Sequence, residues 1–127
     1  FCCSDLRPLT GVVGLVDWRT CGAISRALES GIFRGNTGEV LLLPVTGRLG
    51  KLRLFVFGLG PKSRVTVALL RRSLKTAVES MSLAGVQNIS LAVPSAAHAR
   101  TLEKNFLKAT LKEELPNVRQ VLVDNIE

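Results

Sequence analysis

The sequence predicts a single α/β domain with a three-layer α/β/α arrangement around a mixed sheet. Its 127 residues, 46% of them hydrophobic, suffice for one substantial core and are too few for two ordinary domains. Short apolar runs bounded by Gly and Pro, typical of buried strands, alternate with longer segments of helical periodicity. The order of elements requires both a hairpin and crossover connections, which makes the sheet mixed. We therefore expect one domain over residues 1–127.

The chain begins with a short strand at residues 1–3, followed by a loop. From 11 to 30 the apolar residues recur at mixed three- and four-residue spacings, which predicts one helix with a loose or kinked start around Gly14 and Gly22. Trp18 is the only tryptophan, and we expect it to anchor the core.

Two apolar strands form the centre of the predicted sheet. They cover 40–45 and 52–57, and the polar turn 46–51 between them has a length compatible with a hairpin. Pro44 has no N–H to donate to a ladder, so we expect its strand at an edge, or paired on one side only near its end. Gly58 and Gly60 then allow a sharp turn into the next helix.

The second half continues with alternating helices and strands. A helix is expected from near Thr66 to Gly85, with Met81 in its apolar stripe, and a strand at 88–93. A further helix runs from an N-cap at Ser95 to Pro116, and a last strand covers 119–124. His98 is expected to be a surface or boundary histidine, because no nucleophile or orienting carboxylate lies near it in the pattern.

Composition restricts the functional classes. Seventeen Lys and Arg against ten Asp and Glu give a net charge of +7, which permits attraction to nucleic acid, anionic lipid or acidic partners. The cations are scattered, so the charge alone favours a solvated basic surface. No run of about 18 apolar residues occurs, so we expect no membrane span.

The cysteines favour a reducing compartment, and we expect the cytoplasm. Cys2, Cys3 and Cys21 form an odd set, and neighbours on a strand point to opposite faces, so Cys2 and Cys3 would not bridge. Three thiols and one histidine far away in sequence do not make a four-ligand zinc site, so no metal site is expected, and each cysteine is expected as a small buried residue.

Two glycine-containing segments are candidate anion sites. The corner after the second central strand could bind an anion through its amides and a lysine; the other candidate is a loop before the first central strand. Neither a P-loop nor a dinucleotide-binding fingerprint is present, and a plain backbone turn stays the alternative for the corner. The residues are Gly58, Leu59, Gly60, Lys62 and Ser63 in the corner, and Gly35, Asn36, Thr37 and Gly38 in the loop.

An ordered set of segments resembles the N-terminal domain of the cytosolic leucyl aminopeptidases. The resemblance covers residues 1–94 well and the rest only in its helix and strand pattern. The segments that carry it are Arg7-Pro8-Leu9, Gly14-Leu15-Val16-Asp17-Trp18-Arg19, Gly22 with Ser25, Gly31-Ile32-Phe33-Arg34-Gly35, Gly38-Glu39 before Leu41-Leu42-Leu43-Pro44, and Phe55-Val56-Phe57-Gly58-Leu59-Gly60-Pro61.

The resemblance implies a macro-domain-like fold that, in the family, is fused to a catalytic domain with two divalent metals. The catalytic motif Asn-Thr-Asp-Ala-Glu-Gly-Arg is absent from the sequence, so no family catalytic residue can be carried over. We therefore expect no cofactor and no peptide hydrolysis in this chain alone. A longer parent would be a metal-dependent leucyl aminopeptidase.

Three functional hypotheses follow from the resemblance. The leading one is a non-catalytic accessory domain that acts in assembly, since the family's enzymes are oligomers, and a homo-oligomer is expected. The second is a module that binds ADP-ribose or another nucleotide-type anion, as macro domains do. The third is a DNA-binding accessory domain, which the net charge would assist.

Overall fold

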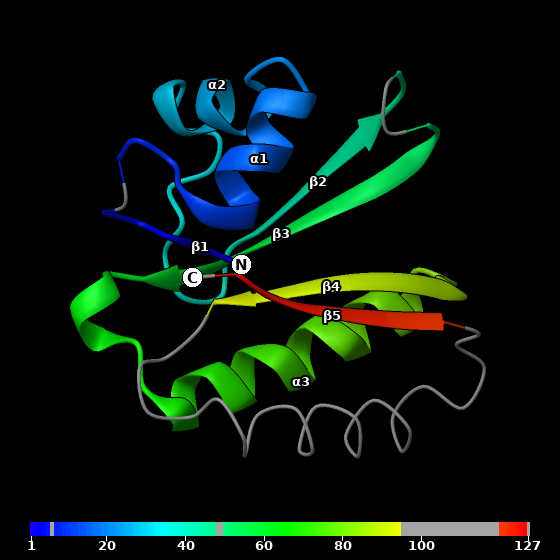
Figure 1. Cartoon of the computed structure of the whole chain (residues 1–127). Coiled ribbons are helices and arrows are strands. Elements are labelled where there is room, and N and C mark those ends of the chain that lie inside the picture. Colours follow the sequence, from blue (N-terminus) through cyan, green and yellow to red (C-terminus); the bar gives the residue numbers. More distant parts are fainter. Residues whose placement is uncertain (6, 48–49, 95–119, 127) are drawn as a thin grey trace. The chain divides into compact units, whose positions relative to one another are not determined.

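The computed structural model describes residues 1–5, 7–47, 50–94 and 120–126 (Figure 1). The chain divides into two compact units, Phe1–Val65 and Thr66–Glu127. The first unit contains a mixed three-stranded sheet and two helices, and the second contains a long helix and a parallel pair of strands. The predicted α/β class with a mixed sheet is thus confirmed. The expectation of a single domain over the whole chain stays a prediction.

The sheet of the first unit has the order β1-β3-β2. Strand β1 (Cys2–Cys3) runs parallel to β3 (Leu52–Gly60), and β2 (Val40–Val45) runs antiparallel to β3. The predicted hairpin is confirmed, and β2 lies at the end of this sheet, as Pro44 indicated. Strand β3 is longer than predicted: Gly58 and Gly60 belong to it because they pair with Cys2 and Cys3.

The predicted helix over 11–30 is wrong as a single element. The chain forms α1 (Gly11–Arg19) and α2 (Ala23–Glu29) instead. Cys21 and Gly22 between them adopt left-handed φ values of 55° and 78°, and one such residue suffices to stop an α-helix. The apolar spacing continues across this break, because both helices pack on the same core. That core consists of Cys2, Ile24, Ala27, Phe33, Leu41 and Val56.

Two side chains of this region lie elsewhere than predicted. Trp18 is 65% exposed, so the expectation that it anchors the core is wrong. Its neighbour Asp17 is the buried residue of α1, and successive side chains of a helix point about 100° apart. Cys21 is also exposed, because it lies in the turn after α1, whereas Cys2 is buried as expected and Cys3 is half-buried. All three thiols are free.

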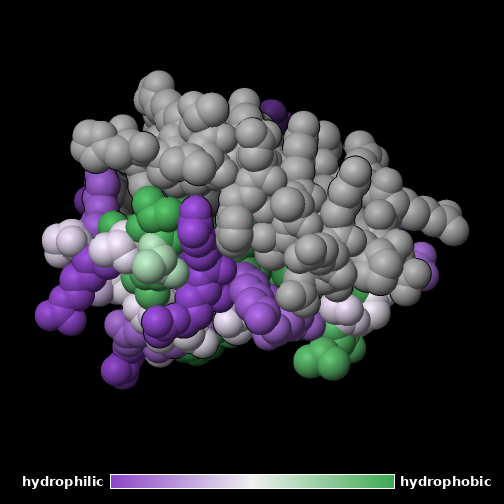
Figure 2. All heavy atoms as spheres, turned by 90° about the horizontal axis from the view of Figure 1, so that it is seen from below, coloured by the Kyte–Doolittle hydropathy of each residue, from purple (hydrophilic) through white to green (hydrophobic). Residues whose placement is uncertain are grey.

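The second unit contains α3 (Val67–Leu83) and the strands β4 (Asn88–Pro94) and β5 (Gln120–Ile126). Thr66 caps α3 by accepting a hydrogen bond from the Leu69 N–H at 3.2 Å. The apolar stripe expected for α3 is buried in its middle, with Met81 5% exposed, whereas Val67 and Leu83 at its two ends, which were also expected to be buried, are 36% and 89% exposed. Strands β4 and β5 are parallel, and both predicted strands are confirmed in place. Figure 2 shows hydrophilic side chains gathered beside a few hydrophobic ones on the described part of one face.

Some expectations lie outside the described residues. These are the helix from Ser95 to Pro116 and the environment of His98. Among the helices described, none combines the length and the apolar character that crossing a membrane requires.

Candidate functional site

The two candidate anion segments meet in the fold, although residues 39–57 separate them in the sequence. The Gly60 N–H donates to the Gly35 carbonyl at 2.8 Å, and the Gly58 N–H donates to the Glu39 carbonyl at 2.8 Å. The Thr37 hydroxyl donates to the Leu59 carbonyl at 3.0 Å. The loop 35–38 therefore packs directly on the end of β3, and the corner and the loop form one site.

Glycine is required where these backbones approach each other. A Cβ atom on Gly58 would lie 2.0 Å from the Asn36 carbonyl oxygen, which is well inside van der Waals contact. Gly60 has a φ of 76°, and a Cβ there would lie 2.7 Å from the Thr37 hydroxyl oxygen. Gly58 is thus retained for space, and Gly60 for both space and backbone conformation.

Two carboxylates of the chain itself accept hydrogen bonds from backbone N–H groups of this site. Asp5 accepts a hydrogen bond from the Lys62 N–H at 2.9 Å, at the start of the short 3₁₀ helix η1 (Lys62–Arg64). Glu39 Oε2 accepts the N–H groups of Arg34 at 2.8 Å and Asn36 at 3.1 Å. Backbone N–H groups that line a turn form a small concave anion site. Here the anion that they bind is the Glu39 carboxylate of the same chain.

The hydrogen bonds to Glu39 alter its titration. The pKa of the Glu39 carboxyl is lowered, mainly by the hydrogen bond from the Arg34 N–H and further by those from Asn36 and Gly35. Donors that favour the ionised form act in this direction. Glu39 is therefore held ionised as the anion of its own loop.

An external anion would have to use other groups of the corner. Four of its backbone groups, the N–H groups of Gly58, Gly60 and Lys62 and the carbonyl of Leu59, have partners within the chain. The side chains of Lys62 and Ser63 are exposed. Anion binding at the corner and at the loop stays a prediction.

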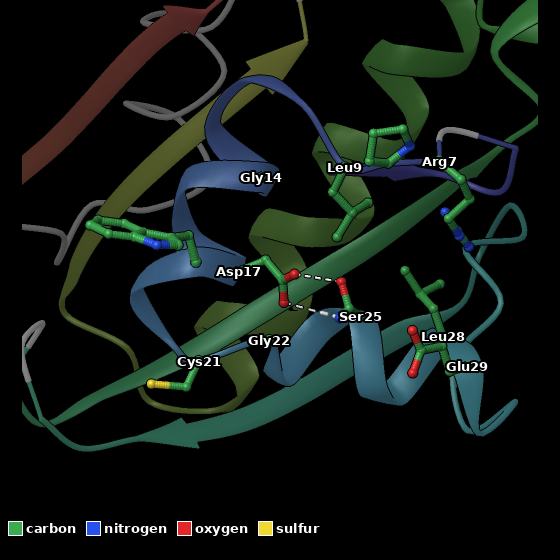
Figure 3. Close-up of a pocket in the computed structure, with 11 residues that line it drawn as sticks. Arg7, Leu9, Gly14, Asp17, Cys21, Gly22, Ser25, Leu28 and Glu29 are labelled. Carbon is green, nitrogen blue, oxygen red and sulfur yellow. Dashed lines mark hydrogen bonds between the residues drawn. The ribbon is translucent and has the colours of Figure 1, made fainter.

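A second feature of the first unit is a hollow of about 480 Å³ beside α1 and α2 (Figure 3). Asp17 lies in its wall and is 9% exposed. Asp17 Oδ1 accepts the N–H groups of Ile24 at 2.8 Å and Ser25 at 3.0 Å, and Oδ2 accepts the Ser25 hydroxyl. The lining residues are Arg7, Pro8, Leu9, Gly14, Asp17, Trp18, Cys21, Gly22, Ser25, Leu28 and Glu29.

Asp17 is a helix cap supplied by a different helix. The first N–H groups of α2 have no acceptor within the helix, and a carboxylate there also interacts favourably with the helix dipole. The sequence pattern alone indicates no role for Asp17. The sequence signal for this cap is an acidic residue a few positions before Gly22 and Ser25. It can be interpreted only once the helix is known to break between Asp17 and Ser25.

A protein metal site needs several converging ligand side chains. Within the residues that the structure describes, no group of three or more His, Cys, Asp or Glu side chains is placed to bind a metal ion. Burial raises the pKa of the Cys2 thiol, which keeps that sulfur protonated.

Known proteins share this fold and sequence pattern. The model of the cytosol aminopeptidase family, N-terminal domain, matches residues 4–111. A probable cytosol aminopeptidase of Ralstonia nicotianae is 28% identical over 86 residues, which are 68% of this chain and 17% of that protein. A mutant of tomato leucine aminopeptidase superposes with a TM-score of 0.58 at 17% identity, covering 88% of this chain and 24% of that one. The superposition shows the fold, and this chain spans less than a quarter of either protein's length.

Proposed function

The chain belongs to the cytosol aminopeptidase family, whose N-terminal domain it represents, and from this we propose that it is a non-catalytic accessory domain that acts in assembly. We further propose that the assembly is a homo-oligomer in the cytoplasm. Where such a domain is joined to a catalytic domain, we propose that the two divalent metals and the peptidase chemistry reside there. The matched relatives, which are several times longer than this chain, support this division.

The observation that carries the proposal is the outward face of α1. Leu15 and Trp18 are three positions apart, so they lie on one side of the helix, and they are 51% and 65% exposed. The guanidinium of Arg19 lies 5.1 Å from the centre of the Trp18 ring. Tryptophan and arginine are the residues that most often dominate protein–protein contacts, and adjacent exposed apolar side chains favour a partner surface.

The carboxylates of the first unit support a structural role. Asp5, Asp17 and Glu39 each accept hydrogen bonds from backbone N–H groups. These interactions hold the corner, the α2 N-terminus and the loop 35–38 in place. Carboxylates engaged in this way stabilise the fold, which favours a structural role for them.

Sedimentation velocity over a range of concentrations tests the assembly role. We expect Trp18→Arg to weaken self-association at least about tenfold, a loss of ~1.4 kcal/mol. Ile32→Arg is the matched control: Ile32 is 79% exposed, lies outside α1, and should leave the association unchanged. Because Trp18 is the only tryptophan, its emission should shift to shorter wavelength as the chain associates. A monomer at every concentration, or equal effects of both variants, would contradict the proposal.

Hydrolysis of leucine amide with added Mn²⁺ tests the non-catalytic part. The purified chain should show no cleavage above buffer, and cleavage that copurifies with the chain would overturn the proposal.

Calorimetric titration with ADP-ribose tests the remaining prediction for the corner. Heat of binding that the unmodified chain gives and the Lys62→Ala variant does not give would establish that prediction. No heat at about 1 mM ADP-ribose, which corresponds to a binding free energy near 4 kcal/mol, would exclude it.

A further inference from the structure

Every second residue of β2 directs its backbone N–H and C=O groups away from β3, toward the outer edge of the sheet. The Gly58 N–H donates to the Glu39 carbonyl at 2.8 Å, and the antiparallel register continues with Val40 opposite Phe57. In an antiparallel ladder the residues alternate between facing the partner strand and facing away from it. Leu41 and Leu43 therefore turn their backbone groups to β3, and Val40 and Leu42 turn theirs outward.

The side chains on this edge fit an added strand. In the part of the chain that the structure describes, the sheet ends at β2. Val40 and Leu42 are 46% and 50% exposed, whereas Leu41 and Val45 are buried. The backbone of Pro44 faces outward, as those of Val40 and Leu42 do, so its missing N–H removes no hydrogen bond to β3. An added strand can therefore pair only with the part of β2 before Pro44. The exposed apolar edge is thus short and has a defined end.

The charge near this edge identifies the partner. From Val40 to the end of the first unit at Val65, the sequence has five Lys and Arg residues and no Asp or Glu. Lys51 is exposed in the turn of the hairpin, and Arg53 lies directly opposite Pro44, on the same face of the sheet as Val40 and Leu42. Two copies paired at this edge would bring like charges together, whereas an acidic strand would complement them.

We propose that the outer edge of β2 binds an extended acidic segment of another polypeptide as an added strand. Its backbone pairs with Val40 and Leu42, its apolar side chains contact theirs, and its carboxylates lie near Lys51 and Arg53. Main-chain bonds give such complexes their affinity, and alternate side chains give them their specificity. This inference goes beyond the proposed self-association, which uses the face of α1, and adds a partner of a different kind.

Fluorescence anisotropy with a labelled, end-capped peptide tests the inference. The odd residues of the peptide are valine and glutamate, which share one face of an extended strand, and the even residues are threonine. We expect saturable binding that weakens with added salt, because part of it comes from Lys51 and Arg53. In an extended peptide alternate N–H groups point to opposite sides. Methylating the nitrogens of one alternate set of peptide residues, odd or even, should therefore weaken binding at least about tenfold, and methylating the other set should leave it within about twofold. Equal behaviour of the two methylated peptides would overturn the inference.

Variants of the chain test the same edge. Leu42→Pro removes one outward N–H and no N–H that faces β3, and we expect it to weaken peptide binding at least about tenfold, with Leu42→Val as the control that retains the N–H. Lys51→Glu should weaken binding more than Arg64→Glu, which changes the net charge equally at an exposed residue of η1. Should Leu42→Pro fail to fold, the methylated peptides on the unmodified chain still decide the question.

Three further outcomes would also overturn the inference. One is no saturable binding at about 1 mM peptide. Another is undiminished binding by a folded Leu42→Pro variant. The third is a dimer that this variant dissociates without peptide, which would assign the edge to a second copy. If self-association persists and depends on Trp18 while the peptide fails to bind, the assembly role stands and only the strand-addition inference falls.

Discussion

Asp17 shows how much one buried carboxylate can organise in a small unit. Its Oδ1 atom accepts two N–H groups at the start of α2, so truncation leaves the buried Ile24 N–H and the half-buried Ser25 N–H without this acceptor. We expect Asp17→Ala to lower the free energy of unfolding by about 2 kcal/mol. Urea denaturation followed by circular dichroism measures this. Ser25→Ala removes only the hydroxyl contact and should cost less; equal losses would show that the backbone bonds contribute little.

Glu39 predicts a pH dependence with a defined sign. Its folded-state pKa is lowered from the ordinary value of 4.5, so the carboxylate stabilises the fold above that value, and this contribution is lost as the pH falls through the folded pKa. We expect Glu39→Gln to be less stable than the unmodified chain at neutral pH, and the difference to vanish in acid. Urea midpoints measured from neutral pH down into acid, well below the ordinary value of 4.5, test it.

Glu79→Gln is the matched control for the loss of one carboxylate. Glu79 is exposed on α3, in the second unit. A difference between Glu39→Gln and the unmodified chain that stays constant with pH would refute the role of the Arg34 and Asn36 hydrogen bonds.

At the scale of elements, the contact between β3 and the loop 35–38 depends on a missing side chain. A methyl group on Gly58 would overlap the Asn36 carbonyl oxygen, and both partners are backbone, so neither can turn away. We expect Gly58→Ala to destabilise the chain by about 3 kcal/mol. Gly38→Ala is the control: it meets open space at a φ of 88° and should cost only about 1 kcal/mol of backbone strain. The two variants compared by urea denaturation distinguish overlap from strain, and similar losses would refute the close approach.

The elements that the sequence predicted are those with local signals. Apolar runs mark strand β2 and its hairpin partner, and apolar periodicity marks α3 and β4. Pro44 added that β2 lies at an edge. The break between α1 and α2 was missed because Cys21 in a left-handed conformation has no sequence signal, and the apolar spacing continues across it. Trp18 was misplaced for a related reason: a helix face is defined by its partner, which the pattern does not reveal.

The candidate site was predicted in its parts and not in its arrangement. Glycine spacing drew attention to the residues of the corner and of the loop, because glycine permits turns and close approach. That the loop packs on the corner is a tertiary fact. Likewise, Asp5 and Glu39 are distant or unremarkable in the sequence, and only the fold shows that their carboxylates accept the amides of the site.

At the scale of the whole molecule, the net charge of +7 is the property with a direct physical consequence. The exposed side of α3 carries Arg71, Arg72 and Lys75, and hydrophilic groups are visible on the described part of the face in Figure 2. A basic surface attracts any polyanion by releasing counterions, and this attraction carries no sequence information. We therefore expect duplex DNA to bind weakly, with a dissociation constant of about 10⁻⁵ M, and to dissociate steeply as salt is raised.

Anisotropy with two unrelated duplexes of equal length measures both properties. The duplexes should bind alike, and affinity should fall at least about tenfold between 50 and 200 mM salt, since several phosphate contacts are lost together. Arg72→Gln should weaken binding and Glu79→Gln should strengthen it, because both residues are exposed on α3 and each change alters the net charge by one in opposite directions. A preference for one duplex, or affinity that is insensitive to salt, would mean that the chain reads DNA by specific contacts. The basic surface would then do more than attract polyanions in general.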